Sequence, residues 1–236
     1  NFIDCIKYAK DKGIKEVSTL THGFKLTLPF FEKITEAGID WITISIDGTD
    51  EVYNEIRKPL KFQELLQKIK DIKNFKDQNN LKKPVIKVQG IWPAIAKNPD
   101  KYYDTFYPYV DQIAYNPLID YLWKDSEIEY IDDDFACPQQ YQRLVVGADG
   151  LIMKCSNDEE NKEIVGNLNT ESVHDVWHGE KLQKVRELHK SYKGYLKNSV
   201  CRKCYLPRKT KDDVFEVKGR KIVVKNYTKR SQIIGD

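Results

Sequence analysis

Strand-like and helix-like patterns alternate along the first 130 residues of the chain. The clearest strand is Trp41–Ile46, a nearly continuous run of β-branched residues, which is typical of a strand buried on both faces of a parallel sheet. Shorter β-rich runs bounded by turn residues predict three further strands at Lys15–Thr21, Pro84–Ile91 and Val110–Tyr115.

Helical patterns separate these strands. Asn1–Lys12 is amphipathic and precedes Gly13, a common helix C-cap, and Leu28–Glu36 carries a proline in its first turn. A further helical stretch surrounds Lys101–Tyr109. The longest helix shows apolar residues at helical spacing along one face, namely Phe62, Leu65, Leu66, Ile69, Ile72 and Phe75. The alternation predicts an α/β class with a parallel sheet, either doubly wound or an arc of a barrel.

Four cysteines dominate the second half of the chain. Apolar alternation after Cys137, an Asp-Gly turn at 149–150 and a second short strand ending at Cys155 predict a hairpin that brings two thiols together. Cys201 and Cys204 form a CxxC pair, whose spacing suits two ligands of one metal group. Four thiolates in two pairs fit either tetrahedral zinc or a 4Fe–4S cluster.

The remaining composition narrows the class of protein. Five cysteines are an odd count for a disulfide framework, and Cys5 lies in a helical pattern that predicts a buried small hydrophobe. A formal net charge of +3 is too close to balance to indicate nucleic-acid binding. Without a signal peptide or an apolar run of about 18 residues, we expect no membrane association and a reducing, cytoplasmic compartment.

Polar residues follow two of the predicted strands. One strand ends in Thr21-His22-Gly23, and Trp41–Ile46 runs into Ser45-Ile46-Asp47-Gly48, with Arg57 in the next helix. Ser and Asp at a strand end can bind ribose hydroxyls, and an Arg can pair with a carboxylate. The plainer alternative is that the Ser-x-Asp-Gly segment turns the chain and caps the following helix.

Three histidines lie near the cysteines, and the last segment forms a separate pattern. His174, His178 and His189 show no ligand-like spacing, so we expect them to have surface or helix-capping roles. Val214–Val217 and Ile222–Val224 flank a glycine and predict a hairpin in the tail.

The order of these motifs resembles a known family. Cys137-x12-Gly150-x4-Cys155, then Gly166-Asn167-Leu168, Trp177, Arg186 and Cys201-x2-Cys204, resembles the SPASM/twitch auxiliary-cluster domain of radical S-adenosylmethionine (SAM) enzymes. The two strand-end segments resemble the third and fourth strands of the radical SAM barrel. His22 departs from the Thr-Asn-Gly usual there.

The resemblance implies an architecture and a set of site residues. Residues 1–130 would be a partial radical SAM (β/α) barrel of about four strands, 131–210 a small α+β SPASM/twitch-like domain, and 211–236 a hairpin tail. The SAM ribose and carboxylate would be bound by Ser45 and Arg57, with Asp47 supporting that loop and Gln89 facing the same cavity. One auxiliary 4Fe–4S cluster would be held by Cys137, Cys155, Cys201 and Cys204.

The resemblance also implies an oxidoreductase-type radical function. In the full-length enzyme a 5′-deoxyadenosyl radical would act on a sugar-type small molecule or a peptide, with a flavodoxin or ferredoxin as electron donor. The sequence contains no CxxxCxxC loop for the SAM-cleaving cluster. We therefore expect a fragment that is inactive alone, with a partner chain or a missing segment completing the barrel.

Two other interpretations explain the same cysteines. A zinc-stabilised, non-enzymatic α/β binding or scaffold protein would need the four thiolates but not Ser45 or Arg57. An electron carrier would use the cluster without SAM.

Overall fold

The computed structural model describes residues 1–119 and 132–228, which fall into two compact units. Unit 1 comprises residues 1–118 and 212–226, and unit 2 comprises 119, 132–211 and 227–228 of the described chain.

Unit 1 is built on a parallel sheet whose four strands follow one another in chain order. The strands are β1 (Ser18–Thr21), β2 (Trp41–Ser45), β3 (Val85–Ile91) and β4 (Gln112–Asn116). A doubly wound sheet reverses its strand order at a switch point and carries helices on both faces. Here the order does not reverse, so the sheet is an arc of a (β/α) barrel. The predicted α/β class is confirmed.

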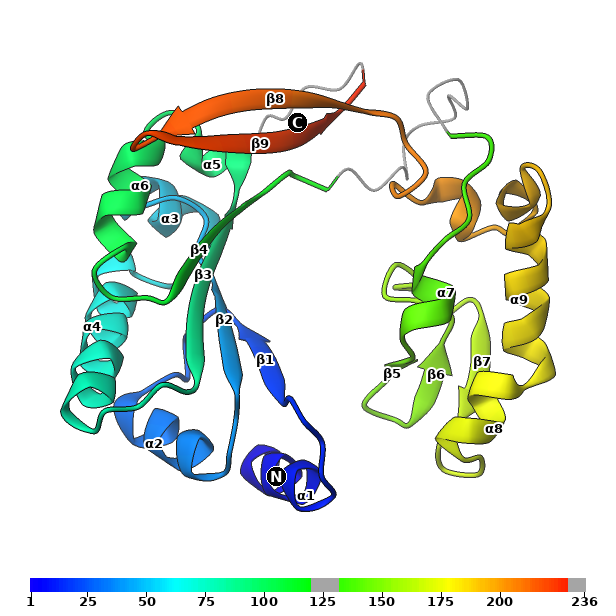
Figure 1. Cartoon of the computed structure of the whole chain (residues 1–236), viewed down its shortest axis with the longest axis horizontal. Coiled ribbons are helices and arrows are strands. Elements are labelled where there is room, and N and C mark those ends of the chain that lie inside the picture. The colour runs from blue at the N-terminus through cyan, green and yellow to red at the C-terminus, as the bar shows by residue number, and fades with distance from the viewer. Residues whose placement is uncertain (120–131, 229–236) are drawn as a thin grey trace. The chain divides into compact units, whose positions relative to one another are not determined.

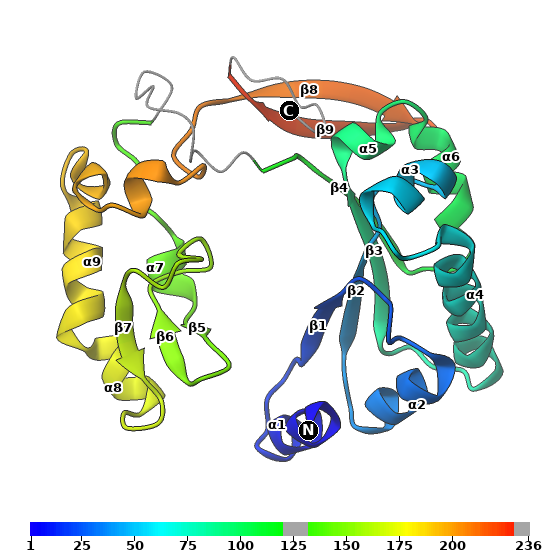
Figure 2. The ribbon, with the colours of Figure 1, turned by 180° about the vertical axis from the view of Figure 1, so that it is seen from behind.

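Helices cover one side of this sheet. In Figure 1, and from behind in Figure 2, α2, α4 and α6 lie along the same side. Every helix predicted in this part of the chain is present. The helices of unit 1 are α1 (Phe2–Asp11), α2 (Leu28–Glu36), α3 (Asp50–Ile56), α4 (Phe62–Gln78), α5 (Trp92–Ile95) and α6 (Pro99–Phe106).

The two faces of the sheet differ in chemistry. Burial alternates along β2 and β3, and the side chains that pack into the hydrophobic core include Ile42, Ile44, Ile86 and Val88. The half-buried face carries polar residues from both strands, namely Thr43, Ser45, Lys87 and Gln89. A strand turns alternate side chains to opposite faces, so the sheet has an apolar outer face and a polar inner face.

A close backbone approach fixes the carboxyl ends of β2 and β3. The backbone N–H of Ile46 donates to the carbonyl of Gln89 at 2.7 Å. The hydroxyl of Tyr102, on α6, donates to the carbonyl of Ile46 at 3.0 Å. A Cβ at Gly90 would lie 2.2 Å from that carbonyl oxygen, so only glycine fits there.

The prediction for Cys5 is wrong. Cys5 is exposed, and α1 buries Ile6 instead. Ile6 supplies the fully buried contact of α1, with the neighbouring Ile3 packing partly against the core. The thiol therefore falls on the solvent side of the helix.

Unit 2 combines a small antiparallel sheet with helices. The predicted hairpin is present as β5 (Val145–Val146) and β6 (Leu151–Met153), and β7 (Ile164–Asn167) adds to β6. Its helices are α7 (Gln139–Gln142), α8 (Val173–His178), α9 (Glu180–Lys190) and two 3₁₀ turns, η3 (Gly194–Lys197) and η4 (Cys201–Lys203).

Buried Arg186 links the helices of unit 2. Its Nε donates to the carbonyl of Gln140 at 3.0 Å, and its Nη1 donates to the carbonyl of Trp177 at 2.8 Å. The guanidinium also lies 4.5 Å from the centre of the Trp177 ring. These contacts tie α9 to α7 and α8 around the small apolar core of Ile152, Val165, Val176 and Leu182.

The tail forms the predicted hairpin, β8 (Thr210–Val217) and β9 (Arg220–Tyr227). Val224 is part of the core of unit 1, and Phe215 packs on Trp92 with ring centres 4.4 Å apart. The domain limits at residues 130 and 210 stay a prediction.

Within the part of the chain that the structure describes, no helix is long and apolar enough to cross a membrane.

Candidate cysteine centre and strand-end site

The four predicted cysteine ligands come from three places in unit 2. Cys137 precedes α7, Cys155 follows β6, and Cys201 and Cys204 bracket the η4 turn. The first three are buried and Cys204 is half-buried. The four thiols are close enough to interact electrostatically. Cys155 interacts with Cys137 and Cys201, and Cys204 interacts with each of the other three. The fold therefore gathers all four thiols into one neighbourhood.

Three of these sulfurs accept hydrogen bonds from nearby backbone. In each case one donor is the N–H two residues farther on, from Gln139, Asn157 and Leu206 respectively. Cys137 and Cys155 also accept from the next N–H along the chain, that of Gln140 and Asp158. The side-chain amide of Asn157 also donates to the Cys204 sulfur at 3.2 Å. N–H donors stabilise the negative charge of a thiolate, and this is the environment that iron–sulfur ligands use.

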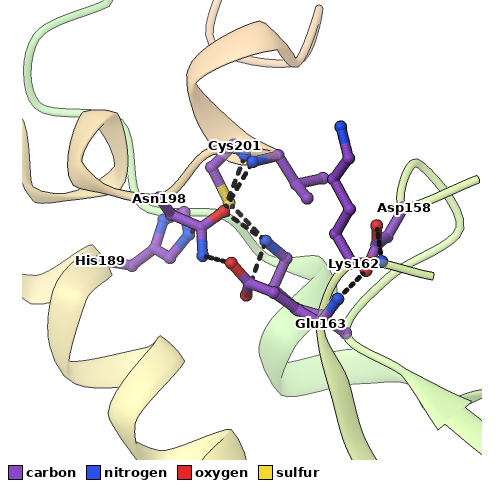
Figure 3. A network of polar contacts seen from close by, with 8 residues as sticks. Asp158, Lys162, Glu163, His189, Asn198 and Cys201 are labelled. Carbon is purple, nitrogen blue, oxygen red and sulfur yellow. Dashed lines mark hydrogen bonds and ion pairs between the residues drawn. The ribbon is translucent and has the colours of Figure 1, made fainter. Parts of the chain in front are cut away.

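The fourth sulfur, that of Cys201, has different donors (Figure 3). Lys154 Nζ lies 3.4 Å from this sulfur, and His189 Nε2 lies 3.4 Å from it. Lys154 immediately precedes Cys155, and His189 lies in the last turn of α9. Two side chains from distant parts of unit 2 thus meet at one cysteine.

A polar network holds the Lys154 ammonium in place. The side chain is fully buried, with its Nζ 2.5 Å from Asn198 Oδ1 and 3.1 Å from Glu163 Oε2. Asn198 also donates its Nδ2 to Glu163 and accepts from the backbone N–H of Cys201 at 3.0 Å. A buried charge is costly unless it is paired and hydrogen-bonded, and both conditions are met here.

The hydrogen bonds of His189 define its tautomer. The backbone N–H of Cys137 donates to His189 Nδ1 at 3.3 Å, so Nδ1 must be the unprotonated nitrogen of the neutral ring. Nε2 then carries the proton and donates to the Cys201 sulfur. Burial and, secondarily, Lys154 lower the pKa of His189, which favours this neutral form.

Burial raises the pKa of all four cysteine thiols. The effect is largest at Cys201, where burial raises the pKa to about 12 although Lys154 opposes the shift. A free thiol is therefore protonated at neutral pH. Binding a metal group must release these protons, as is usual for thiolate sites.

The expected surface role of the histidines is wrong for His189 and right for the other two. His174 and His178 are exposed, whereas His189 is buried between two cysteines. Its place on the buried face of α9, one helical turn beyond Val185, was the available sequence signal. Lys154 and Asn198 gave no such signal.

Within residues 1–119 and 132–228, no group of three or more His, Cys, Asp and Glu side chains is arranged to hold a single metal ion. The fit of the cysteines to a metal group rests on their donor chemistry: four sulfurs, three buried and one half-buried, each already supplied with N–H donors.

The strand-end residues of unit 1 form a second candidate site. Asp47, just after β2, is buried, and its Oδ2 accepts from Arg57 Nε at 2.8 Å and lies 2.5 Å from Arg57 Nη2. Its Oδ1 accepts from the backbone N–H of Ile91 at 3.0 Å. Asp47 thus joins the end of α3 to the end of β3, and about a third of the Arg57 side chain stays exposed.

The other two predicted residues lie beside each other. Ser45 and Gln89 are register partners on β2 and β3, and both belong to the polar inner face. A cavity of about 410 Å³ adjoins this end of the sheet and is lined by His22, Arg57 and neighbouring residues. His22 Nδ1 accepts from the backbone N–H of Phe24 at 3.2 Å, so it shapes the turn after β1.

Comparison with known proteins supports the cysteine centre first. Residues 137–205 match the family model of the SPASM domain, described as an iron–sulfur cluster-binding domain. This span begins at the first predicted ligand and ends just after the last. The predicted resemblance to a SPASM domain, and the iron–sulfur cofactor that it implies, are confirmed. No curated protein sequence matches the chain.

Solved structures support the fold over most of the chain. BtrN in complex with AdoMet and 2-DOIA is 16% identical, with a TM-score of 0.50 over 87% of this chain and 66% of that one. BtrN in an open conformation is 14% identical, with a TM-score of 0.50 over 87% and 64%. Native anSMEcpe with bound AdoMet and Cp18Cys peptide is 13% identical, with a TM-score of 0.50 over 86% and 78%.

At these identities the likeness shows the fold, which is that of radical SAM enzymes with a SPASM domain. The predicted fold class, a partial radical SAM barrel followed by a SPASM-type domain, is confirmed. The chain spans about two thirds of the length of the BtrN structures.

Proposed function

We propose that this chain is the C-terminal part of a radical SAM enzyme and that it binds one auxiliary 4Fe–4S cluster. Cys137, Cys155, Cys201 and Cys204 are the proposed ligands. The observation that carries the proposal is the gathering of four thiols, three buried and one half-buried, each with N–H donors at its sulfur, inside the segment that matches an iron–sulfur domain. When bound, such a cluster supplies one-electron transfer.

The strand-end site is the proposed contact for SAM. Ser45 and Gln89 present a hydroxyl and an amide from adjacent strands, which suits ribose hydroxyls. Arg57 lines the adjoining cavity, and Asp47 orients its guanidinium so that a free edge can pair with the carboxylate of SAM. Carboxyl ends of parallel strands are where barrel enzymes bind their ligands.

Radical generation by the full-length enzyme is part of the same proposal. The 5′-deoxyadenosyl radical comes from SAM when a second cluster delivers an electron, and the printed sequence holds no CxxxCxxC loop for that cluster. The loop must therefore come from a segment or partner chain outside these residues, with a flavodoxin- or ferredoxin-type protein as the electron source.

The substrate class is proposed from the structural neighbours. BtrN was crystallised with 2-DOIA and anSMEcpe with a peptide, so the shared fold accepts both small molecules and peptides. For this chain we favour a sugar-type small molecule, acted on by an oxidoreductase of the cytoplasm.

Anaerobic reconstitution with iron and sulfide tests the proposal. We expect about four iron and four sulfide per chain, together with the broad visible absorption of a 4Fe–4S cluster. Stoichiometric zinc with no visible band, after the same treatment, would instead establish the zinc-stabilised scaffold.

A further inference from the structure

Lys154 and His189 act on one cluster ligand, and this has a consequence for electron transfer. We propose that these two residues raise the reduction potential of the auxiliary cluster by stabilising charge on the Cys201 sulfur. The inference rests on the proposed function, because it needs a cluster on the four cysteines. It assigns the two side chains a tuning role, with no direct part in the reaction.

The ammonium of Lys154 supplies the larger effect. It is fully buried and lies 3.4 Å from the Cys201 sulfur. Reduction adds one negative charge to the cluster and its thiolates, and the attraction of a nearby cation for that charge is much stronger in a buried site than in water. The reduced state gains more from Lys154 than the oxidised state does, so the potential rises.

The neighbours of Lys154 keep the ammonium at this position. Glu163 neutralises part of its charge from 3.1 Å, and Asn198 accepts from it at 2.5 Å. Glu163 is partly exposed, with 28% of its side chain accessible, so solvent screens its charge more than that of Lys154. The net electrostatic potential that Lys154 and Glu163 produce at the Cys201 sulfur is therefore positive.

His189 adds a neutral hydrogen bond to the same sulfur. Because Nδ1 accepts from the backbone of Cys137, Nε2–H points at Cys201. Hydrogen bonds to cluster sulfurs are among the factors that set the potential. His189 also contacts the backbone of one ligand and the sulfur of another, so it fixes the positions of both cysteines.

The arrangement singles out one ligand. Among the described residues, the donors at Cys137, Cys155 and Cys204 are backbone or amide N–H groups, whereas Cys201 receives an ammonium and an imidazole. The step affected is the uptake of one electron by the oxidised cluster from an external one-electron donor. No bond forms or breaks in that step.

The test compares reconstituted Lys154→Met, His189→Phe and Lys154→Arg with the unmodified chain. Lys184→Met is the matched control, because Lys184 is an exposed lysine of α9 in the same unit. Iron and sulfide content is measured first. The midpoint potential is then measured by anaerobic redox titration, with the electron paramagnetic resonance signal of the reduced cluster as readout.

We expect a more negative potential in Lys154→Met, by at least about 59 mV, which is a tenfold change in the equilibrium constant of a one-electron couple. His189→Phe shifts the potential in the same direction by less, Lys154→Arg stays near the unmodified value, and Lys184→Met does not change it. Fully loaded Lys154→Met and His189→Phe variants with unchanged potentials would overturn the inference.

Two results separate this inference from the proposed function. If the unmodified chain assembles no 4Fe–4S cluster, the proposed function fails. If Lys154→Met alone loses the cluster because Glu163 is left unpaired, the double variant Lys154→Met/Glu163→Gln removes both charges and restores a neutral network. The reduction potential of that double variant then tests the inference. If neither variant of Lys154 assembles the cluster, the reduction potential of His189→Phe tests it instead.

Discussion

The carboxylate of Asp47 holds the guanidinium of Arg57 by two nitrogens, with Nε at 2.8 Å and Nη2 at 2.5 Å from the same oxygen. The other carboxylate oxygen accepts from the backbone N–H of Ile91. Asp47 is buried and Arg57 is partly exposed. The pair fixes the direction of the guanidinium while leaving part of it toward the adjoining cavity.

This geometry predicts separable effects on SAM binding. We expect Arg57→Ala to weaken SAM binding by about tenfold or more, because a charge-assisted contact with the carboxylate contributes about 1.5–3 kcal/mol. Asp47→Asn keeps the guanidinium but loosens its orientation, so its effect should be smaller. Equilibrium dialysis with radiolabelled SAM measures both.

Arg220→Ala serves as the control, since Arg220 belongs to the tail hairpin of unit 1 and stacks near Tyr103. Its affinity for SAM should equal that of the unmodified chain. An Arg57→Ala variant that binds SAM as tightly as the unmodified chain would show that Arg57 does not contact the ligand.

We expect four of the five cysteines to bind the cluster and the fifth, Cys5, not to bind it. We expect Cys155→Ala and Cys201→Ala to lose most of the iron, because three thiolates cannot complete the ligation of a four-cysteine cluster. Cys5→Ser should keep the full iron content, because Cys5 is exposed on α1 in the other unit. Iron and sulfide assays after anaerobic reconstitution distinguish the two outcomes, and retention of iron by Cys155→Ala would exclude that ligand.

Local patterns predicted most of unit 1 correctly. Leu28–Glu36 is helical over the range predicted, and the β-branched run at Trp41 became β2, one residue shorter than expected. The structure of such segments can be predicted locally, because the hydrophobic period and the flanking glycine or proline indicate the same element. The choice between a doubly wound sheet and a barrel arc depended on strand order, which local patterns do not encode.

Long-range contacts account for what the sequence did not predict. The cysteines were identified from their own spacing, but Lys154 and His189 reach Cys201 only because α9 and β6 pack against one core. A lysine before a cysteine is ordinarily solvated. Lys154 is buried because its ammonium pairs with Glu163 and is hydrogen-bonded to Asn198. The prediction that Cys5 is buried was wrong because α1 presents Ile6, and not Cys5, to the core.

Gly90 gives a test of the strand packing beneath the proposed SAM site. A Cβ there would lie 2.2 Å from the carbonyl oxygen of Ile46 and 2.8 Å from Ile95 Cδ1, so the backbone of β2 must move. We expect Gly90→Ala to destabilise the chain by about 2–3 kcal/mol, in the range of overpacked cores. Chemical unfolding followed by tryptophan fluorescence measures the change.

Gly147→Ala is the comparison, since the nearest atom to its Cβ is the flexible carboxylate of Asp149. Its effect should be within about 1 kcal/mol. Equal stability of Gly90→Ala and the unmodified chain would mean that β2 and β3 lie farther apart at this end than the structure shows.

The last prediction concerns Asp40, which anchors the amino-terminal side of the sheet. Its carboxylate accepts from Lys10 Nζ at 2.8 Å, Lys83 Nζ at 2.6 Å and the backbone N–H of Val17 at 2.9 Å. These donors hold the pKa of Asp40 well below its usual range, with Lys10 the largest cause. Asp40→Asn should therefore cost about 2 kcal/mol at neutral pH, as expected when a charge-assisted network is lost.

The lowered pKa also determines how this difference depends on pH. In the unfolded chain Asp40 titrates near its ordinary value of about 3.9, so the ionised form contributes its full stabilisation above that pH. As the pH falls below about 4, the unfolded state binds a proton that the folded state excludes, and the stabilisation is progressively lost. Urea unfolding at pH 7, 5 and 3 should show the gap between the unmodified chain and Asp40→Asn narrowing only at pH 3. Asp4→Asn, at an exposed position of α1, should show no comparable gap at any of these values. A gap that stays constant down to pH 3 would mean that Asp40 is not held ionised by its neighbours.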